Sequence, residues 1–271
     1  MFSWKDCYAR YINLAHRKDR LAHMINELDR VGISAERFEA IRTIDHQWDR
    51  EPYKKMYART RGAIGCMLSQ MAVMQNAFDA GKGAIVLEDD LVMATDLLER
   101  LDYIENFVNT KEPDTDIIFL GGTVHCGPAW WHSQEHEPML RPYCNCTLGR
   151  DMERIDDEHM VRVYGMFSTH AYAVPYEKIP KILKLLNDVM HITIGIDFSF
   201  IIHQPKLKCF AYLPGLIKQY NAVSDIGEGS VTYFENFSKL NGSIENSKYW
   251  WADKKDDVDL SSFDWKEALL K

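Results

Sequence analysis

Three consecutive acidic residues, Glu88, Asp89 and Asp90, follow a short run of apolar residues at positions 84–87. The run is too short for a helix and is preceded by glycines, so we expect a short buried strand. Three carboxylates at the end of a buried strand repel one another unless a cation or water offsets their charge. They therefore predict either a metal site for a phosphorylated ligand or a solvated acidic turn leading into the next helix.

Carboxylate oxygens of this kind suit Mg²⁺ or Mn²⁺, which keep coordination positions open for water and phosphate oxygens. Because neighbouring side chains on a strand point to opposite faces, we expect Glu88 and Asp90 to share a face that Asp89 does not. An ion bound there would hold a diphosphate and stabilise its charge on departure.

Three cations, Arg17, Lys18 and Arg20, follow the first strand that the sequence predicts. A helix N-terminus favours anions, so these cations gain nothing from the helix dipole. Two interpretations stay open: an anionic ligand bound at that terminus, or a solvated helix face.

A single acid, Asp197, lies among apolar residues in the segment IGIDF. Burial raises the pKa of a carboxyl group and suits it to proton abstraction. Alternatively, Asp197 caps a helix over residues 198–203. Further along, Gln219 and Ser224 follow a strand predicted at 208–213, in a loop that can return to the edge of the sheet.

Residues 123–159 are rich in Cys, His, Pro, Trp and acids and show little periodicity. The spacing of the Cys and His residues matches no standard zinc site. A loop of this length inside a compact domain is usually functional or disordered.

The first half of the chain alternates between strand-like and helix-like segments. Strands are predicted at 11–14, 36–41, 84–87 and 116–120, and helices at 21–31, at 61–80 and after a cap at Thr95 with an inward stripe that starts at Leu98. The second half adds a strand-like segment at 161–174, a helix at 176–186 and a strand at 208–213. This order predicts an α/β sheet with mostly parallel strands whose C-terminal ends share one edge.

The chain has 271 residues and a net charge of −8. Its acidic balance argues against a nucleic-acid partner, which needs a basic face. No apolar run approaches the roughly 18 residues of a transmembrane segment, and the N-terminus lacks the pattern of a signal peptide. Six cysteines in a chain of this length are typical of reduced thiols. We therefore expect a cytoplasmic protein, which can also lie at the periphery of a membrane.

Taken in order, these segments resemble glycosyltransferase family 25, the lipopolysaccharide and procollagen galactosyltransferase-like enzymes. The segments that carry the resemblance span roughly residues 8–227: YINLAHRKDRLAHM, RFEAI, GAIGCMLSQMAVMQNAF, IVLEDDLVM, GMFSTHAYAV, IGIDFSF and LPGLIKQYNAVSDI. One position departs from the family pattern, because Gln70 stands where the family usually has His. An amide at this position can still donate a hydrogen bond.

The resemblance implies a GT-A fold, in which helices flank a Rossmann-like, mixed and mostly parallel sheet. It implies Mn²⁺ or Mg²⁺ as cofactor, held by Asp90 and Glu88 at a DxD-like motif, and Asp197 as the general base. The residues that it assigns to the nucleotide-sugar donor are Asn13, Leu14, Arg17, Arg20, Ser69, Gln70, Glu88, Asp89, Gln219 and Ser224.

The implied activity is transfer of a hexose, galactose or glucose, from a UDP-sugar to a hydroxyl of a glycan or protein acceptor, with inversion. We expect a glycosyltransferase domain over residues 1–227, with residues 123–160 as an inserted loop on the acceptor side. Residues 228–271 are expected to form an irregular tail packed on the domain, whose aromatics are compatible with a homodimer. Two alternatives are a catalytically silent GT-A-like binding protein and a metal-dependent phosphohydrolase.

Overall fold

The computed structural model describes residues 1–42, 61–124, 152–189, 195–212 and 215–219. In this part of the chain the main sheet has eight strands: β1 (Tyr8–Asn13), β2 (Glu36–Glu39), β3 (Ala84–Leu87), β5 (Ile117–Phe119), β7 (Met152–Arg154), β8 (Met160–Val163), β10 (Ala171–Val174) and β11 (Cys209–Tyr212). Two small antiparallel sheets pair β4 (Leu91–Met93) with β12 (Ile217–Gln219), and β6 (Thr123–Val124) with β9 (Met166–Phe167). The helices are α1 (Lys18–Val31), α3 (Arg61–Asp79), α4 (Leu97–Thr110), α6 (Ile179–Val189) and α7 (Ile196–His203), with 3-10 turns η1 (Trp4–Asp6), η4 (Tyr176–Lys178) and η5 (Gln204–Lys206).

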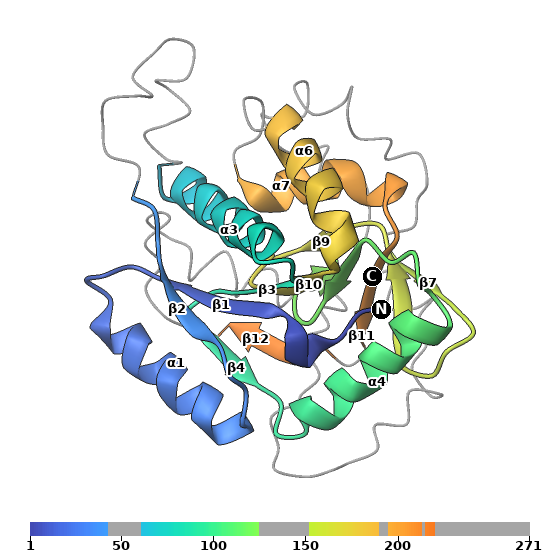
Figure 1. The fold of residues 1–271 in the computed structure, drawn as a ribbon, viewed down its shortest axis with the longest axis horizontal. Coiled ribbons are helices and arrows are strands. Elements are labelled where there is room, and N and C mark those ends of the chain that lie inside the picture. The colour runs from blue at the N-terminus through green and yellow to red at the C-terminus, as the bar shows by residue number, and fades with distance from the viewer. Residues whose placement is uncertain (43–60, 125–151, 190–194, 213–214, 220–271) are drawn as a thin grey trace, which may run out of the picture.

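The main sheet lies between two layers of helices (Figure 1). Helices α1 and α4 cover one face, and α3, α6 and α7 cover the other. In the order β2-β1-β3-β10-β5-β11-β8-β7, all the described strands run in one direction except β10 and β8. The predicted mixed, mostly parallel α/β sheet flanked by helices is confirmed.

Several element boundaries differ from the sequence prediction. Helix α1 starts at Lys18, earlier than expected, and ends as predicted at Gly32, whose φ of 71° is the left-handed conformation of a C-terminal glycine. Helix α4 is preceded by Asp96 and not by Thr95, and Leu97 is the residue buried in its first turn. The Thr95 cap was therefore wrong, and the inward stripe begins one residue earlier than expected.

The antiparallel elements were not predicted. Strand β10 runs against both of its neighbours, β3 and β5. Strand β6 begins the segment predicted as an irregular loop over residues 123–160, β7 lies within it, and β8 begins at its last residue. The rest of that loop, residues 125–151, and the tail at 228–271 lie outside the described residues, as does the domain boundary at 227. No helix in the described ranges has both the length and the apolar character to cross a membrane.

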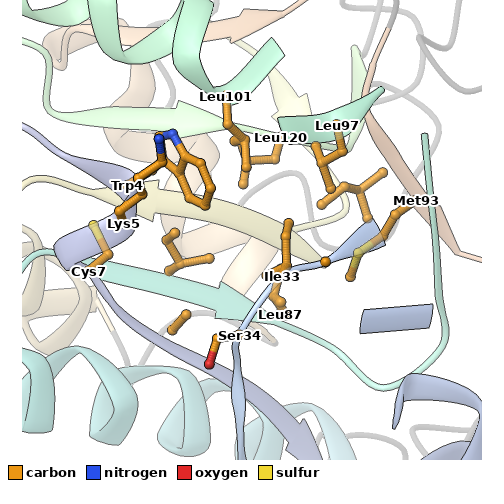
Figure 2. A pocket seen from close by; sticks show the side chains of 14 residues that line it. Trp4, Lys5, Cys7, Ile33, Ser34, Leu87, Met93, Leu97, Leu101 and Leu120 are labelled. Carbon is orange, nitrogen blue, oxygen red and sulfur yellow. The ribbon is translucent and has the colours of Figure 1, made fainter. Parts of the chain in front are cut away.

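An apolar cavity of about 200 Å³ lies on the side of the sheet covered by α1 and α4. Figure 2 shows Trp4, Leu97, Leu101 and Leu120 among the side chains around it. No carboxylate lines the cavity. Its lining is mostly apolar, and none of the three acids at the end of β3 is part of it.

Gly121 follows β5 where β12 crosses the sheet. A Cβ atom at this position would overlap the carbonyl oxygen of Ile217 and Nε2 of His170. The absence of a side chain therefore lets β12 lie against the end of β5.

We expect Gly121→Ala to lower the free energy of unfolding by about 3 kcal/mol, because backbone and a buried ring must both move. Gly81→Ala is the control, since Gly81 has open space around it and a φ of 70°. That substitution should cost only about 1 kcal/mol for the left-handed backbone. Urea denaturation of both variants measures the difference, and equal losses would contradict the close approach.

Candidate functional site

The three acids lie at a bend between two sheets. Strand β3 ends at Leu87, and the chain turns through Glu88, Asp89 and Asp90 before β4 leaves the main sheet to pair with β12. Asp89 and Asp90 are only 6% and 8% exposed. The solvated acidic turn is therefore wrong, because these carboxylates are buried and are followed by a strand.

Asp89 binds the first strand and the first helix. Its Oδ2 accepts a hydrogen bond of 2.7 Å from Nδ2 of Asn13, and its Oδ1 accepts one of 2.7 Å from Arg20. Arg20 also lies 3.1 Å from Oδ2 of Asp90. Asn13 is held in turn by Arg37, whose Nε donates to its Oδ1 at 2.9 Å. The structure thus brings Asn13, Arg20 and Asp89 together as a bonded group.

Glu88 and Asp90 share the opposite side of the bend. Nε2 of Gln219 donates to both carboxylates, at 2.8 Å to Glu88 and 3.1 Å to Asp90. Gln70 of α3 donates to the other oxygen of Glu88 at 3.2 Å, and the thiol of Cys66 lies 3.5 Å from that oxygen. Gln219 thus joins Glu88 to Asp90, as expected for side chains on a shared face, but Arg20 also joins Asp90 to Asp89.

Asp197 lies in the first turn of α7. The residue that caps this helix is Gly195, so the alternative that Asp197 is the cap was wrong. Its Oδ1 accepts hydrogen bonds from both the backbone N–H of Thr169, at 2.8 Å, and the hydroxyl of Thr169, at 2.7 Å.

Burial and mutual repulsion raise the pKa values of these carboxyls. The pKa of Glu88 is raised to about 8, first by burial and then by the charges of Asp90 and Asp197. Burial also raises the pKa of Asp90, against the opposing effect of Arg20, and that of Asp197. No described Lys, Arg or His forms an ion pair with Glu88 or Asp197. The site therefore carries more potential negative charge than its described neighbours offset.

This donor set fits a divalent cation that takes part of its coordination from a ligand. Within the described ranges, no group of three or more His, Cys, Asp or Glu side chains is arranged to hold a metal by itself. Mg²⁺ and Mn²⁺ sites that use one or two carboxylates, water and substrate phosphates need no such group. Asp90 and Glu88 remain the predicted ligands.

Arg17, Leu14 and Ser224 are also predicted to contact the donor. Nε and one terminal nitrogen of Arg17 donate to the Asp19 carboxylate, at 3.0 and 2.8 Å. Leu14 accepts the backbone N–H of Arg17 in the turn before α1. The donor contacts of Arg17 and Leu14 stay predictions, and Ser224 lies outside the described residues.

Ser69 is fully buried and joins two elements. Its hydroxyl donates to the carbonyl of Gly65 at 2.6 Å and accepts the backbone N–H of Ile41 at 2.8 Å. These bonds tie α3 to the segment after β2. Contact between Ser69 and a donor stays a prediction.

Sequence reasoning did not single out Thr169, His170 or Cys66. All three lie in segments that carry the family resemblance, GMFSTHAYAV and GAIGCMLSQMAVMQNAF. They lie close to the acids because elements that are far apart in the sequence pair with one another. The carbonyl of His170 accepts the backbone N–H of Glu88 at 2.8 Å, and its Nε2 donates to the carbonyl of Ile217 at 3.0 Å.

The buried ring of His170 predicts an acid-dependent loss of stability. Burial lowers its pKa to about 4, below the unfolded value near 6.5. The folded state therefore takes up fewer protons, and its stability falls as the pH drops from 6.5 towards 4, by about 3 kcal/mol in total.

The matched variant is His170→Gln, whose amide can donate to Ile217 and does not titrate. We expect the difference in unfolding free energy between wild type and variant to shrink as the pH falls through this range. Parallel stability curves, measured by urea denaturation at several pH values, would contradict a neutral buried His170.

The fold and the site define a class: an α/β protein with a buried carboxylate cluster where its central strands end. Residues 10–199 match the family described as "Glycosyltransferase family 25 (LPS biosynthesis protein)". The chain therefore belongs to glycosyltransferase family 25.

A rat protein, "Probable inactive glycosyltransferase 25 family member 3", is 30% identical over 123 residues. The match covers 41% of this chain and 22% of the rat protein, so the chain spans about a fifth of that relative. Among solved structures, a glycosyltransferase involved in the glycosylation of the major capsid of PBCV-1 has a TM-score of 0.40 at 10% identity, covering 86% of this chain and 98% of its own. Mouse xyloside xylosyltransferase 1 in its apo form has a TM-score of 0.38 at 11% identity, covering 73% and 68%.

Proposed function

We propose that this protein is a glycosyltransferase that transfers a hexose, galactose or glucose, from a UDP-sugar to a hydroxyl of a glycan or protein acceptor. The transfer inverts the anomeric carbon and uses Mn²⁺ or Mg²⁺. Membership of glycosyltransferase family 25 supports the reaction class.

The observation that carries the proposal is the charge balance of the site. Four acids from two separate segments, Glu88, Asp89, Asp90 and Asp197, interact there. In the described structure Arg20 pairs with Asp89 and Asp90, and no described cation pairs with the other two. Such an arrangement favours binding of an added cation, because burial without one disfavours the charged carboxylates. A sugar nucleotide diphosphate supplies the anion that such a cation holds.

Hydrogen-bond lengths favour Asp90 over Asp89 as the metal ligand. Both oxygens of Asp89 accept bonds of 2.7 Å, whereas the two contacts of Asp90 are 3.1 Å each. Asp90 is therefore the carboxylate whose protein contacts are more easily exchanged for an ion. Asp90 and Glu88 would hold the ion, which when bound would supply positive charge beside the departing diphosphate.

Asp197 is the group that receives the acceptor's proton. As the acceptor oxygen attacks the anomeric carbon, its proton passes to the Asp197 carboxylate. The bond from the anomeric carbon to the diphosphate oxygen breaks, and its electron pair leaves with UDP. Desolvation makes this carboxylate a stronger base than an exposed one.

A catalytically silent protein that still binds a sugar nucleotide is the second candidate. The rat relative is named as probably inactive. Gln70, which replaces the His usual at this position, bonds Glu88 inside the site. This candidate predicts binding of a UDP-sugar without release of UDP.

A panel of nucleotide sugars, assayed for UDP release with and without Mn²⁺, tests the proposed function. We expect release with UDP-galactose or UDP-glucose that EDTA abolishes and Mn²⁺ restores. Asp90→Asn should lower this Mn²⁺-dependent rate by at least about 100-fold, since one metal ligand is lost. Binding without turnover would support the silent candidate, and full activity of Asp90→Asn in EDTA would exclude the metal role. Release of inorganic phosphate instead of UDP would indicate a phosphohydrolase.

Asp197→Asn tests the general base. The amide keeps the size of the side chain and can still accept the Thr169 hydrogen bonds through its oxygen. We expect kcat for transfer to fall between about 100- and 10,000-fold, with the KM for the donor unchanged. Steady-state kinetics measures both constants, and a kcat within tenfold of wild type would contradict the role of Asp197.

A further inference from the structure

A short segment before β10 links Asp197 to the rest of the site. Ser168 has a φ of 61°, and it is the one non-glycine residue with a positive φ in the described structure. Left-handed backbone at a residue with a side chain costs free energy, so it persists where surrounding contacts impose it. The strained residue directly precedes Thr169, which bonds Asp197.

The two bonds from Thr169 go to the same oxygen. The backbone N–H and the hydroxyl both donate to Oδ1 of Asp197, at 2.8 and 2.7 Å. Each carboxylate oxygen has two lone pairs in its plane, so these donors saturate Oδ1. No described residue donates to Oδ2, and the Asp197 residue is partly exposed, whereas Thr169 is buried.

We propose that Thr169, placed by the left-handed backbone at Ser168, is a positioning residue that occupies Oδ1 of Asp197 and leaves Oδ2 to take the acceptor's proton. This inference rests on the proposed role of Asp197 as the general base. A carboxylate held at one oxygen by two donors from a single residue has a fixed plane. Its remaining oxygen then points in one direction, which is what alignment for attack requires.

The titratable groups that face Asp197 come from three elements. Its charge acts on Glu88 at the end of β3, on Cys66 of α3 and on Tyr172 of β10. None of these three donates a hydrogen bond to Asp197 in the described structure. The two Thr169 bonds are therefore the contacts that favour the charged form of Asp197, and burial opposes them.

The same segment also holds Glu88. The carbonyl of His170 accepts the N–H of Glu88 at 2.8 Å. Asp197 and Glu88 are thus held by adjacent residues, Thr169 and His170. A displacement of this segment would move the base relative to the predicted metal ligands.

Thr169→Val and Thr169→Ser form the matched pair for the test. Valine keeps the shape and the backbone N–H but removes the hydroxyl, whereas serine keeps the hydroxyl. We expect Thr169→Val to lower kcat for sugar transfer between about 10- and 100-fold, with the KM for the UDP-sugar unchanged, and Thr169→Ser to restore kcat to within about threefold. A merely structural contact would lower stability in Thr169→Val and leave kcat at the wild-type value.

A backbone pair tests the part played by Ser168. In Ser168→Gly, residue 168 can adopt a positive φ without steric cost, so the kcat of this variant should stay within about threefold of wild type. Ser168→Val resists a positive φ because of its β-branched side chain, and its kcat should fall as in Thr169→Val. Equal kcat values for glycine and valine would contradict the role of the strained backbone. Should Thr169→Val fail to fold, this pair still decides the question.

A second readout separates this inference from the proposed function. In protein labelled with ¹³C at the aspartate carboxyls, we expect the pKa of Asp197 to rise in Thr169→Val and to return in Thr169→Ser. Loss of transfer in Asp197→Asn together with wild-type kcat and an unchanged Asp197 pKa in Thr169→Val would overturn the inference and leave the proposed function standing. Wild-type transfer in Asp197→Asn would instead overturn the proposed base and the inference that rests on it. If the wild type turns over no donor, an unchanged pKa overturns the placement of Thr169, and a shifted pKa supports it.

Discussion

The gathering of four acids, of which Arg20 pairs with two in the described structure, is the constraint on which the rest of this structure depends. A buried carboxylate is tolerated when hydrogen bonds or opposite charges compensate for lost water. Asp89 receives both kinds of compensation, from Asn13 and Arg20. Glu88 and Asp197 receive hydrogen bonds from uncharged groups alone in the described structure. In the described structure hydrogen bonds thus hold Glu88 and Asp197 in place without an opposite charge beside them, and burial raises the pKa of both.

The fold meets this constraint by bringing distant segments to one bend. The chain leaves the main sheet directly after Leu87. Its next strand, β4, pairs with β12 in a separate small sheet. Gln219 reaches Glu88 and Asp90 because β12 lies in register with β4. Strand β10 runs antiparallel between β3 and β5, so the segment preceding it arrives at the edge where β3 ends. A parallel strand in this position would have placed Thr169 and His170 at the opposite edge of the sheet.

Local sequence patterns predicted the elements whose formation depends on residues close together in the chain. Hydrophobic periodicity and the glycines that end elements predicted three of them: the apolar run before Glu88, the helix that ends at Gly32 and the helix that carries Gln70. The alternation expected of a strand predicted the pairing of Glu88 with Asp90, which Gln219 makes although residues 88–90 lie in a bend after β3. The reversed direction of β10 and the bonds of Gln219 and Thr169 depend on pairings across 28 to 131 residues, which no local pattern contains. The resemblance to the family supplied Gln219 as a candidate, but it did not supply Thr169.

The choice of uncharged donors has a chemical consequence at Gln70. A histidine at this position could become a cation beside Glu88 and offset its charge. The amide of Gln70 donates a hydrogen bond to Glu88 and can never carry a positive charge. The Oε1 of Gln70 is buried without a hydrogen-bond partner in the described structure. The orientation that bonds Glu88 therefore leaves this oxygen without a hydrogen bond there. Gln70 therefore bonds Glu88 without adding a positive charge beside it.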